Sequence, residues 1–296
     1  MSKILFKIAV FLMAYAAFVS TIHAKENNHP AFAVTVTGKG QPMILIPGAT
    51  CSGDVWKATV AHYSSKYQCH VITLAGYAGT APLAAAPYLP TMKQQLEQYI
   101  TDQHLDHVVL AGHSIGGYLA LNIAAEMTGH LDKVVIVDAM PFFALQFNPN
   151  APDTFSKAQA EAMLARYNSM DDAALKATQF NTAKFLCRDS TYWDQIATWG
   201  AQSDRKTMAY TMTEMLNSDI RKKIADIKVP VLVLAAYCQS AENPMYTRDF
   251  VVKAYADQYQ YCKACTVHTA ENNTKHFVMY DAPEWYFREM DTFVNQ

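Results

Sequence analysis

The chain has 296 residues, of which 51% are hydrophobic and 17% charged, and its formal net charge at pH 7 is −2. This is a globular composition, with enough apolar material for one large α/β domain or two small ones. No cluster of basic residues occurs, so we expect neither a nucleic-acid partner nor binding to an anionic membrane surface.

The first 24 residues are typical of a secretory signal peptide. Lys3 and Lys7 give a positive start, and residues 8–22 carry no charge. We expect cleavage after Ala24, the small residue that ends this stretch. An uncleaved anchor is the alternative, although the apolar stretch is short for a membrane span. The sequence therefore predicts a periplasmic or secreted protein whose residues 25–296 form one domain, with no stable membrane insertion after cleavage.

All six cysteines lie in the part that would be exported, where disulfides can form. The pair Cys262 and Cys265 has no second Cys or His pair at zinc spacing, so we expect no metal site. It also lies late in the chain, where a redox motif is not expected. Structural disulfides or free thiols are the favoured interpretation, and the pairing stays open. The remaining cysteines are Cys51, Cys69, Cys187 and Cys238.

Strands and helices alternate along the first half of the chain. Apolar runs predict strands at 31–38, 42–48, 70–76, 107–111 and 131–138. Helical periodicity predicts helices at 55–67, 91–103 and 117–126. Thr91 is the expected N-cap of the second helix, after an irregular loop at 77–90 that is rich in Ala, Gly and Pro. Such alternation favours a mostly parallel sheet with helices on both faces.

The alternation stops after residue 140. Residues from 140 to about 225 contain no comparable strand, and this insertion is too long for an ordinary connection. We interpret it as a helical cap over the edge of the sheet where ligands bind. Its expected helices are 155–170, 172–184, 190–199 and 205–216. A strand at 229–236, a helix at 246–258, a strand at 264–269 and a helix at 283–294 complete the chain.

The most informative motif is Gly112-His113-Ser114-Ile115-Gly116, between a buried strand and a helix. This pattern predicts a nucleophilic serine on a sharp strand-to-helix turn. A side chain at Gly112 or Gly116 would collide where the helix starts against the strand. Ser114 is therefore the candidate nucleophile.

A serine hydroxyl needs a base within hydrogen-bond reach and an acid that orients the base. His276 is the candidate base, because it lies in the loop after the last strand and just before the final helix. His268 competes with it but falls within a predicted strand. His113 is the neighbour of Ser114 and should point away from it.

The acid is less clearly marked. The loop after the strand at 229–236 has Gln239 where an aspartate would be convenient, and an amide cannot stabilise an imidazolium as a carboxylate does. Asp138 follows the strand at 131–138 and so lies at the carboxyl edge of the sheet, in the required chain order. We predict Asp138 as the acid, with Glu242 and Asp249 as alternatives.

Acyl transfer also needs donors for the developing oxyanion. The backbone N–H of Ile115, at a helix N-terminus, is the first candidate. The second is the N–H of Ala49 in the loop after the strand at 42–48, with Thr50 as the near alternative.

Together these pieces resemble the α/β-hydrolase superfamily from about residue 31 to the end, and most closely its serine esterases with a helical cap. The resemblance rests on four pieces in order: Ile46-Pro47-Gly48-Ala49 with Trp56 following, Gly112 to Gly117, Val137-Asp138, and His276 to Tyr280 with Pro283-Glu284. It implies an eight-stranded, mostly parallel sheet, a Ser-His-acid triad and no cofactor. Two departures, Pro47-Gly48 in place of His-Gly and Gln239 in place of Asp, bear on the site rather than on the fold.

The resemblance implies a carboxylesterase that acts on small-to-medium esters through an acyl-enzyme on Ser114. An aminopeptidase, a lactonase, a C–C hydrolase or a non-catalytic binding protein of the same fold are the alternatives. The predicted cap is rich in aromatic residues, which favours an acyl or aryl substrate. Met140, Phe142 and Phe143 closely follow Asp138 and are the expected pocket residues. The expected partner is thus a small-molecule substrate, and the sequence leaves the oligomeric state open.

Overall fold

The computed structural model describes residues 31–148, 150–239, 244 and 246–296. The signal peptide expected at 1–24 lies outside these residues, as does Glu242. Within the described part of the chain, no helix is long and apolar enough to cross a bilayer.

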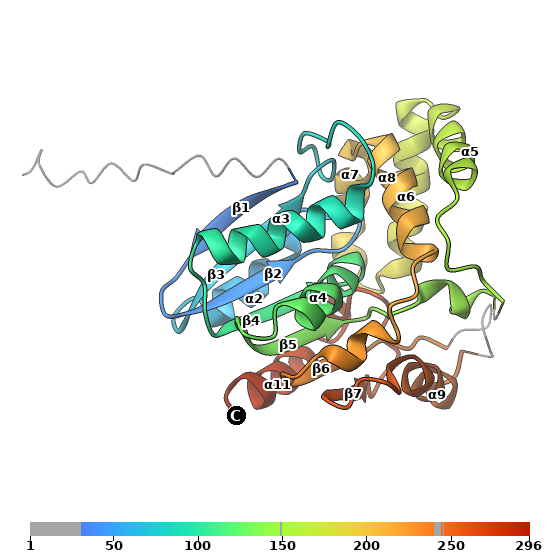
Figure 1. The fold of residues 1–296 in the computed structure, drawn as a ribbon. Coiled ribbons are helices and arrows are strands. Elements are labelled where there is room, and N and C mark those ends of the chain that lie inside the picture. The colour runs from blue at the N-terminus through green and yellow to red at the C-terminus, as the bar shows by residue number, and fades with distance from the viewer. Residues whose placement is uncertain (1–30, 149, 240–243, 245) are drawn as a thin grey trace, which may run out of the picture.

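One sheet organises the described residues (Figure 1). Its order is β1-β3-β2-β4-β5-β6-β7, in which β1 runs antiparallel to β3 and all other neighbours are parallel. The strands are β1 (Phe32–Thr37), β2 (Gln41–Ile46), β3 (Tyr67–Leu74), β4 (Val108–His113), β5 (Leu131–Val137), β6 (Val231–Ala235) and β7 (Cys265–Thr269). Eight strands were expected, and the described residues contain seven, because none precedes the antiparallel edge strand β1 within them.

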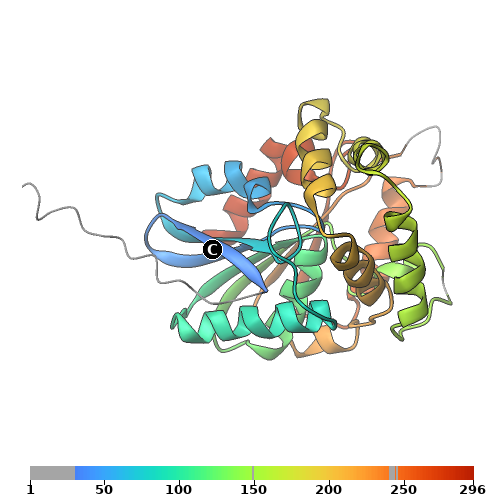
Figure 2. The same cartoon turned by 90° about the horizontal axis from the view of Figure 1, so that it is seen from above.

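Helices cover both faces of the sheet (Figure 2). Side chains of β4 alternate between two hydrophobic cores: Val108 and Leu110 face the core that contains α3, α4 and α9, whereas Val109 and Ala111 face the core that contains α11. This explains why β4 reads as one continuous apolar run. The covering elements are η1 (Gly53–Trp56), α2 (Lys57–Tyr63), α3 (Tyr88–Asp102), α4 (Ile115–Glu126), α9 (Arg248–Tyr259), α10 (Val278–Asp281) and α11 (Pro283–Val294).

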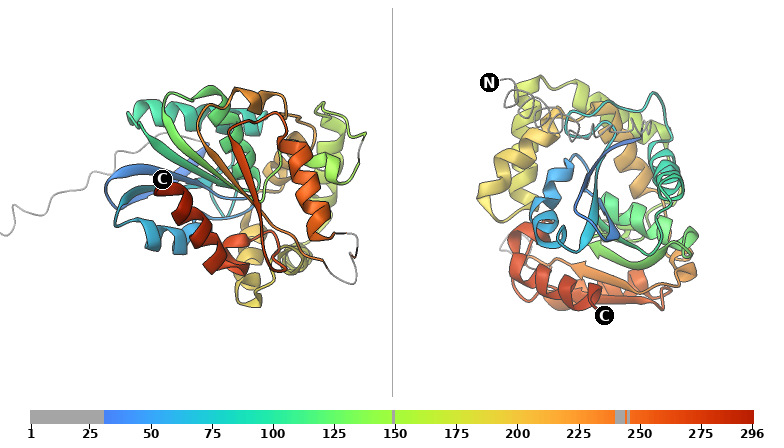
Figure 3. Two further views of the ribbon diagram at one scale, coloured as in Figure 1. Left: turned by 90° about the horizontal axis from the view of Figure 1, so that it is seen from below. Right: turned by 90° about the vertical axis from the view of Figure 1, so that its left-hand side faces the viewer.

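The long insertion between β5 and β6 is helical, as expected, and lies beyond the carboxyl ends of the strands (Figures 1 and 3). Helices α5 and α8 pack as one pair and α6 and α7 as another. The insertion contains η2 (Phe143–Gln146), α5 (Lys157–Asn168), α6 (Asp172–Leu186), η3 (Ser190–Tyr192), α7 (Trp193–Gln202), α8 (Arg205–Leu216) and η4 (Lys223–Asp226).

A side chain of the insertion also caps the N-terminus of α3, and this corrects the prediction that Thr91 is its N-cap. Helix α3 begins at Tyr88, not at Thr91, since Pro90 in its first turn removes only an N–H that needs no intrahelical partner. The carboxylate of Glu214 in α8 accepts hydrogen bonds from the N–H groups of Tyr88 (2.9 Å) and Leu89 (2.7 Å). Thr91 instead donates its hydroxyl to the carbonyl of Pro87.

A second prediction was wrong between residues 63 and 70. The helix expected over 55–67 ends at Tyr63, and β3 begins at Tyr67 instead of at residue 70. The segment 67–69 pairs with both neighbouring strands, Tyr67 with Gln41 and Cys69 with Thr37. Residues 67–69 therefore form a strand, because pairing in the sheet outweighs their helical periodicity.

Candidate active site

Ser114 lies on the turn between β4 and α4 with φ 55° and ψ −122°, a conformation that a non-glycine residue rarely adopts. Neighbouring glycines make the turn possible. A Cβ on Gly112 would lie 2.2 Å from the carbonyl oxygen of Gly116, and a Cβ on Gly116 would lie 2.3 Å from that of Ile46. The collision expected from the sequence at these two glycines is therefore present in the geometry.

Asp138 and His276 come together although 138 residues separate them. Nδ1 of His276 lies 2.6 Å from Oδ2 of Asp138. The other carboxylate oxygen, Oδ1, accepts the N–H of Ala236 (2.8 Å) and the hydroxyl of Tyr255 (2.7 Å). Burial, and then the charge of Asp138, raise the pKa of Tyr255 well above its ordinary value, so this hydroxyl stays protonated and donates. Two donors other than His276 thus fix the carboxylate that orients His276.

The same region contains the sharp turn from β4 to α4 that carries Ser114, which we call the elbow (residues 112–116). Nε2 of His113, the residue before Ser114, lies 3.0 Å from the carbonyl oxygen of His276, and the two imidazole rings are 4.6 Å apart between centroids. The loop between β7 and α10, residues 270–277, carries His276 and is called the histidine loop. The structure therefore brings the histidine loop against the end of β4, next to Ser114. The side chains of His276 and Asp138 are 21% and 15% exposed, so neither is fully buried.

The loop after β2 packs directly on the elbow. A Cβ on Gly48 would lie 3.3 Å from the Cβ of Ser114, so the backbone at 48–49 borders the serine. Ile115 is the first residue of α4, and its N–H belongs to the helical turn whose donors have no intrahelical acceptor. Thr50 has φ 62° and its carbonyl accepts the hydroxyl of Ser203 in the insertion. Gly48, the residue before Ala49, and Ile115 thus adjoin Ser114, and the role of the Ala49 and Ile115 N–H groups as oxyanion donors stays a prediction.

The competing candidates lie elsewhere. His268 is in β7, and its Nδ1 is bonded to Glu289 at 2.7 Å. Asp249 is exposed in the first turn of α9. Gln239 is exposed as well, and its side-chain amide donates to the carbonyl of Pro244. Within the described residues, no hydrogen bond or ring contact joins His268, Asp249 or Gln239 to His276.

The three expected pocket residues are buried or half-buried after β5. Met140 is 3% exposed and Phe142 2% exposed. The Phe142 ring lies under the guanidinium of Arg221, 5.4 Å from its carbon, and the Phe142 backbone is held by Gln258. Phe143 packs edge-on against Phe147. Their role as pocket residues stays a prediction.

A further carboxylate ties the histidine loop to the insertion. Asp281 accepts the backbone N–H groups of Arg188 (2.9 Å), Asp189 (3.0 Å) and Lys275 (2.9 Å). The ring of Tyr280 stacks on Tyr192 with centroids 3.7 Å apart. The end of α6 therefore supports the loop that carries His276. The sequence analysis missed Asp281 and Tyr255, since no local pattern marks a carboxylate or a phenol whose partners are distant in the chain.

Cys262 and Cys265 form a disulfide between α9 and β7, which resolves the open choice for this pair. Cys51, Cys69 and Cys187 are buried free thiols, and Cys238 is a half-buried one. Burial raises the pKa of the Cys51 thiol to about 12, which makes it a poor nucleophile.

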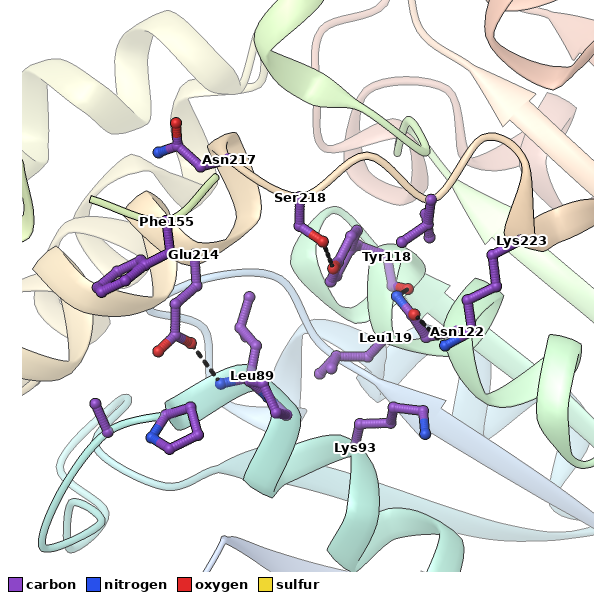
Figure 4. A pocket seen from close by; sticks show the side chains of 14 residues that line it. Leu89, Lys93, Tyr118, Leu119, Asn122, Phe155, Glu214, Asn217, Ser218 and Lys223 are labelled. Atoms are coloured by element: carbon purple, nitrogen blue, oxygen red, sulfur yellow. Dashed lines mark hydrogen bonds between the residues drawn. The ribbon is translucent and has the colours of Figure 1, made fainter. Parts of the chain in front are cut away.

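A groove of about 670 Å³ lies between α3, α4 and α8, away from the site (Figure 4). Leu89, Leu119 and Ile220 line its apolar part. Lys93 and Lys223, at its polar end, both pair with Glu126. None of the candidate catalytic residues lines it.

The chain is similar to known proteins in sequence and in fold. The model of the alpha/beta hydrolase family matches residues 43–289. The pimeloyl-[acyl-carrier protein] methyl ester esterase of Vibrio cholerae serotype O1 is 25% identical over 203 residues, which cover 67% of this chain and 76% of that protein.

Two solved structures are similar in fold. The enol-lactonase from Burkholderia xenovorans LB400 gives a TM-score of 0.72 at 13% identity, with 90% of this chain and 96% of that chain covered. A thermophilic esterase from Thermogutta terrifontis gives 0.70 at 18% identity, with 89% and 93% covered. These two structures show the fold, and the family model, which matches residues 43–289, shows that this chain belongs to the alpha/beta hydrolase family.

Proposed function

We propose that the protein is a serine hydrolase that cleaves carboxylic esters through an acyl-enzyme on Ser114. One observation carries the proposal: Nδ1 of His276 is bonded at 2.6 Å to Asp138, and the same loop contacts the residue before Ser114. A base that is oriented by an acid and lies near a half-buried elbow serine is the arrangement that activates a hydroxyl at neutral pH.

Each group then has a defined task. Nε2 of His276 takes the proton of the Ser114 hydroxyl as Oγ attacks the acyl carbon, and later returns it to the leaving alcohol. Asp138 holds the Nδ1–H tautomer and stabilises the imidazolium. Backbone N–H groups of Ile115 and Ala49 donate to the oxyanion of the tetrahedral intermediate. Water, activated by His276, then hydrolyses the acyl-enzyme. No step in this sequence uses a cofactor.

The relative from Vibrio cholerae favours an ester as the scissile group, because its name describes a methyl ester esterase. We propose that the helices between β5 and β6 act as the cap of the site. Their position beyond the carboxyl ends of the strands supports this, since ligands of parallel sheets bind at that edge. A cap with many aromatic residues suits a small-to-medium ester with an acyl or aryl part.

A fluorophosphonate probe tests the nucleophile. We expect the probe to label the wild-type protein, because an activated serine displaces its fluoride, and we expect no labelling of Ser114→Ala. Ser65→Ala, which changes an exposed serine on the turn after α2, is the control and should label fully. Labelling measured by mass spectrometry would contradict the proposal if it persisted in Ser114→Ala. Absence of labelling in folded wild-type protein would favour the non-catalytic alternative.

We also propose that residues 1–24 direct export and are removed after Ala24. The charge, length and small-residue exit of this stretch support the proposal. The N-terminal sequence of the protein recovered from the periplasm or medium of the producing cell should begin at Lys25. A chain retained inside the cell with an intact Met1 would contradict it.

A further inference from the structure

His113 is a buried histidine that the proposed mechanism does not use. It ends β4 directly before Ser114, and it is 1% exposed. Its Nε2 lies 3.0 Å from the carbonyl oxygen of His276, and its ring contacts the rings of His276 and Phe277 at 4.6 and 5.1 Å between centroids. The side chain of His113 thus contacts the histidine loop, and the backbone of His113 directly precedes Ser114.

The protonation state of His113 follows from these contacts. A carbonyl oxygen only accepts hydrogen bonds, so Nε2 must carry the proton. Nδ1 is buried and has no partner in the part of the chain that the structure describes. Burial, and then the neighbouring His276, hold the pKa of His113 well below its ordinary value. The ring is therefore neutral, with a single donor directed at His276.

The opposite edge of the ring borders the loop after β2. A Cβ on Gly48 would lie only 2.8 Å from Nδ1 of His113. The ring therefore fills the space between the loop that supplies the Ala49 N–H and the loop that supplies His276. Its position is fixed in turn because β4 lies inside the sheet, between β2 and β5.

We propose that His113 is a positioning residue: its Nε2–H holds the His276 backbone, and its ring sets the spacing between His276, Gly48 and Ser114. The inference rests on the proposed function. Asp138 holds His276 by its ring, and His113 holds it by its carbonyl, so together they fix the direction in which Nε2 of His276 points. A displacement of about 1 Å at such a base can cost on the order of 100-fold in rate.

Substitution of His113 by glutamine or by asparagine tests this role, because the two side chains carry the same amide group at different distances from the backbone. Glutamine can place its amide nitrogen near the position of Nε2, whereas asparagine reaches only the position of Nδ1. In hydrolysis of a p-nitrophenyl ester we expect His113→Asn to lower kcat by about 10- to 100-fold with KM changed less than about twofold. His113→Gln should keep kcat within about threefold of wild type. The rate of fluorophosphonate labelling should follow kcat.

Loss of packing alone would also slow His113→Asn, because asparagine is smaller than histidine, but it would leave His113→Met near the wild-type rate, whereas loss of the donor should make His113→Met as slow as His113→Asn. His113→Met fills much of the ring volume without a donor and replaces His113→Asn if that variant does not melt cooperatively. A wild-type kcat in His113→Asn or in His113→Met would overturn the inference. A kcat of His113→Gln as low as that of His113→Asn would overturn it too. If Ser114→Ala still hydrolysed the ester, the proposed function and this inference would both fail. If Ser114→Ala were inactive, failure of the His113 series would concern the inference alone.

Discussion

Replacing Asp138 with asparagine should lower kcat by about 10⁴-fold and leave KM nearly unchanged. This is the loss found when the aspartate of a serine-protease triad becomes asparagine. The cause is the tautomer of the base: an amide N–H directed at Nδ1 of His276 forces the imidazole proton onto Nε2. That nitrogen can then no longer accept the proton of Ser114.

The surroundings of Asp138 determine which way the new amide would face. Oδ1 accepts from two donors, the N–H of Ala236 and the hydroxyl of Tyr255. The amide oxygen of an asparagine must therefore occupy that position, and its NH₂ group must face His276. This orientation is the harmful one, so relaxation of the side chain should not restore activity.

Steady-state hydrolysis of a p-nitrophenyl ester measures the effect, and circular dichroism confirms the fold. Asp249→Asn is the matched control, because Asp249 is an exposed carboxylate of α9 and should leave kcat unchanged. Near-normal kcat in Asp138→Asn would show that another carboxylate serves His276.

Alanine at Gly112 should destabilise the protein by at least about 3 kcal/mol or prevent its folding. The added Cβ would lie 2.2 Å from the carbonyl oxygen and 2.5 Å from the carbonyl carbon of Gly116. Both are backbone atoms at the start of α4, so a side-chain rotation cannot relieve the contact. The elbow would have to open, and the strained backbone at Ser114 would change with it.

Denaturant unfolding compares this variant with Gly129→Ala. A Cβ on Gly129 would meet no atom within 4 Å, so the control should leave the free energy of unfolding nearly unchanged. Equal stability of the two variants would contradict the close approach of β4 and α4 on which the elbow depends.

Much of the fold could be predicted from the sequence, because its signals are local. The strand at 107–111 is marked by a buried apolar run, and the helices of the insertion by their periodicity. The elbow is marked by the spacing of Gly112, Ser114 and Gly116, since backbone crowding acts within five residues. His276 could be inferred from its place after the last strand.

Predictions failed where partners distant in the chain decide the outcome. The N-terminal end of α3 depends on Glu214, which lies 125 residues away from Leu89. The start of β3 depends on pairing with β1 and β2. No periodicity within either segment carries this information, because the stabilising groups come from other elements.

By itself, the sequence determined the alternating strand and helix order, the serine elbow and the candidate base, since each follows from steric or periodic rules over a few residues. The sequence predicted Asp138 among three carboxylates, and only the tertiary structure decided that it lies beside His276, that Tyr255 and Ala236 hold it, and that His113 faces the histidine loop. These are contacts across the ends of β4, β5 and β6, and parallel strands bring such ends together only when the whole sheet has formed.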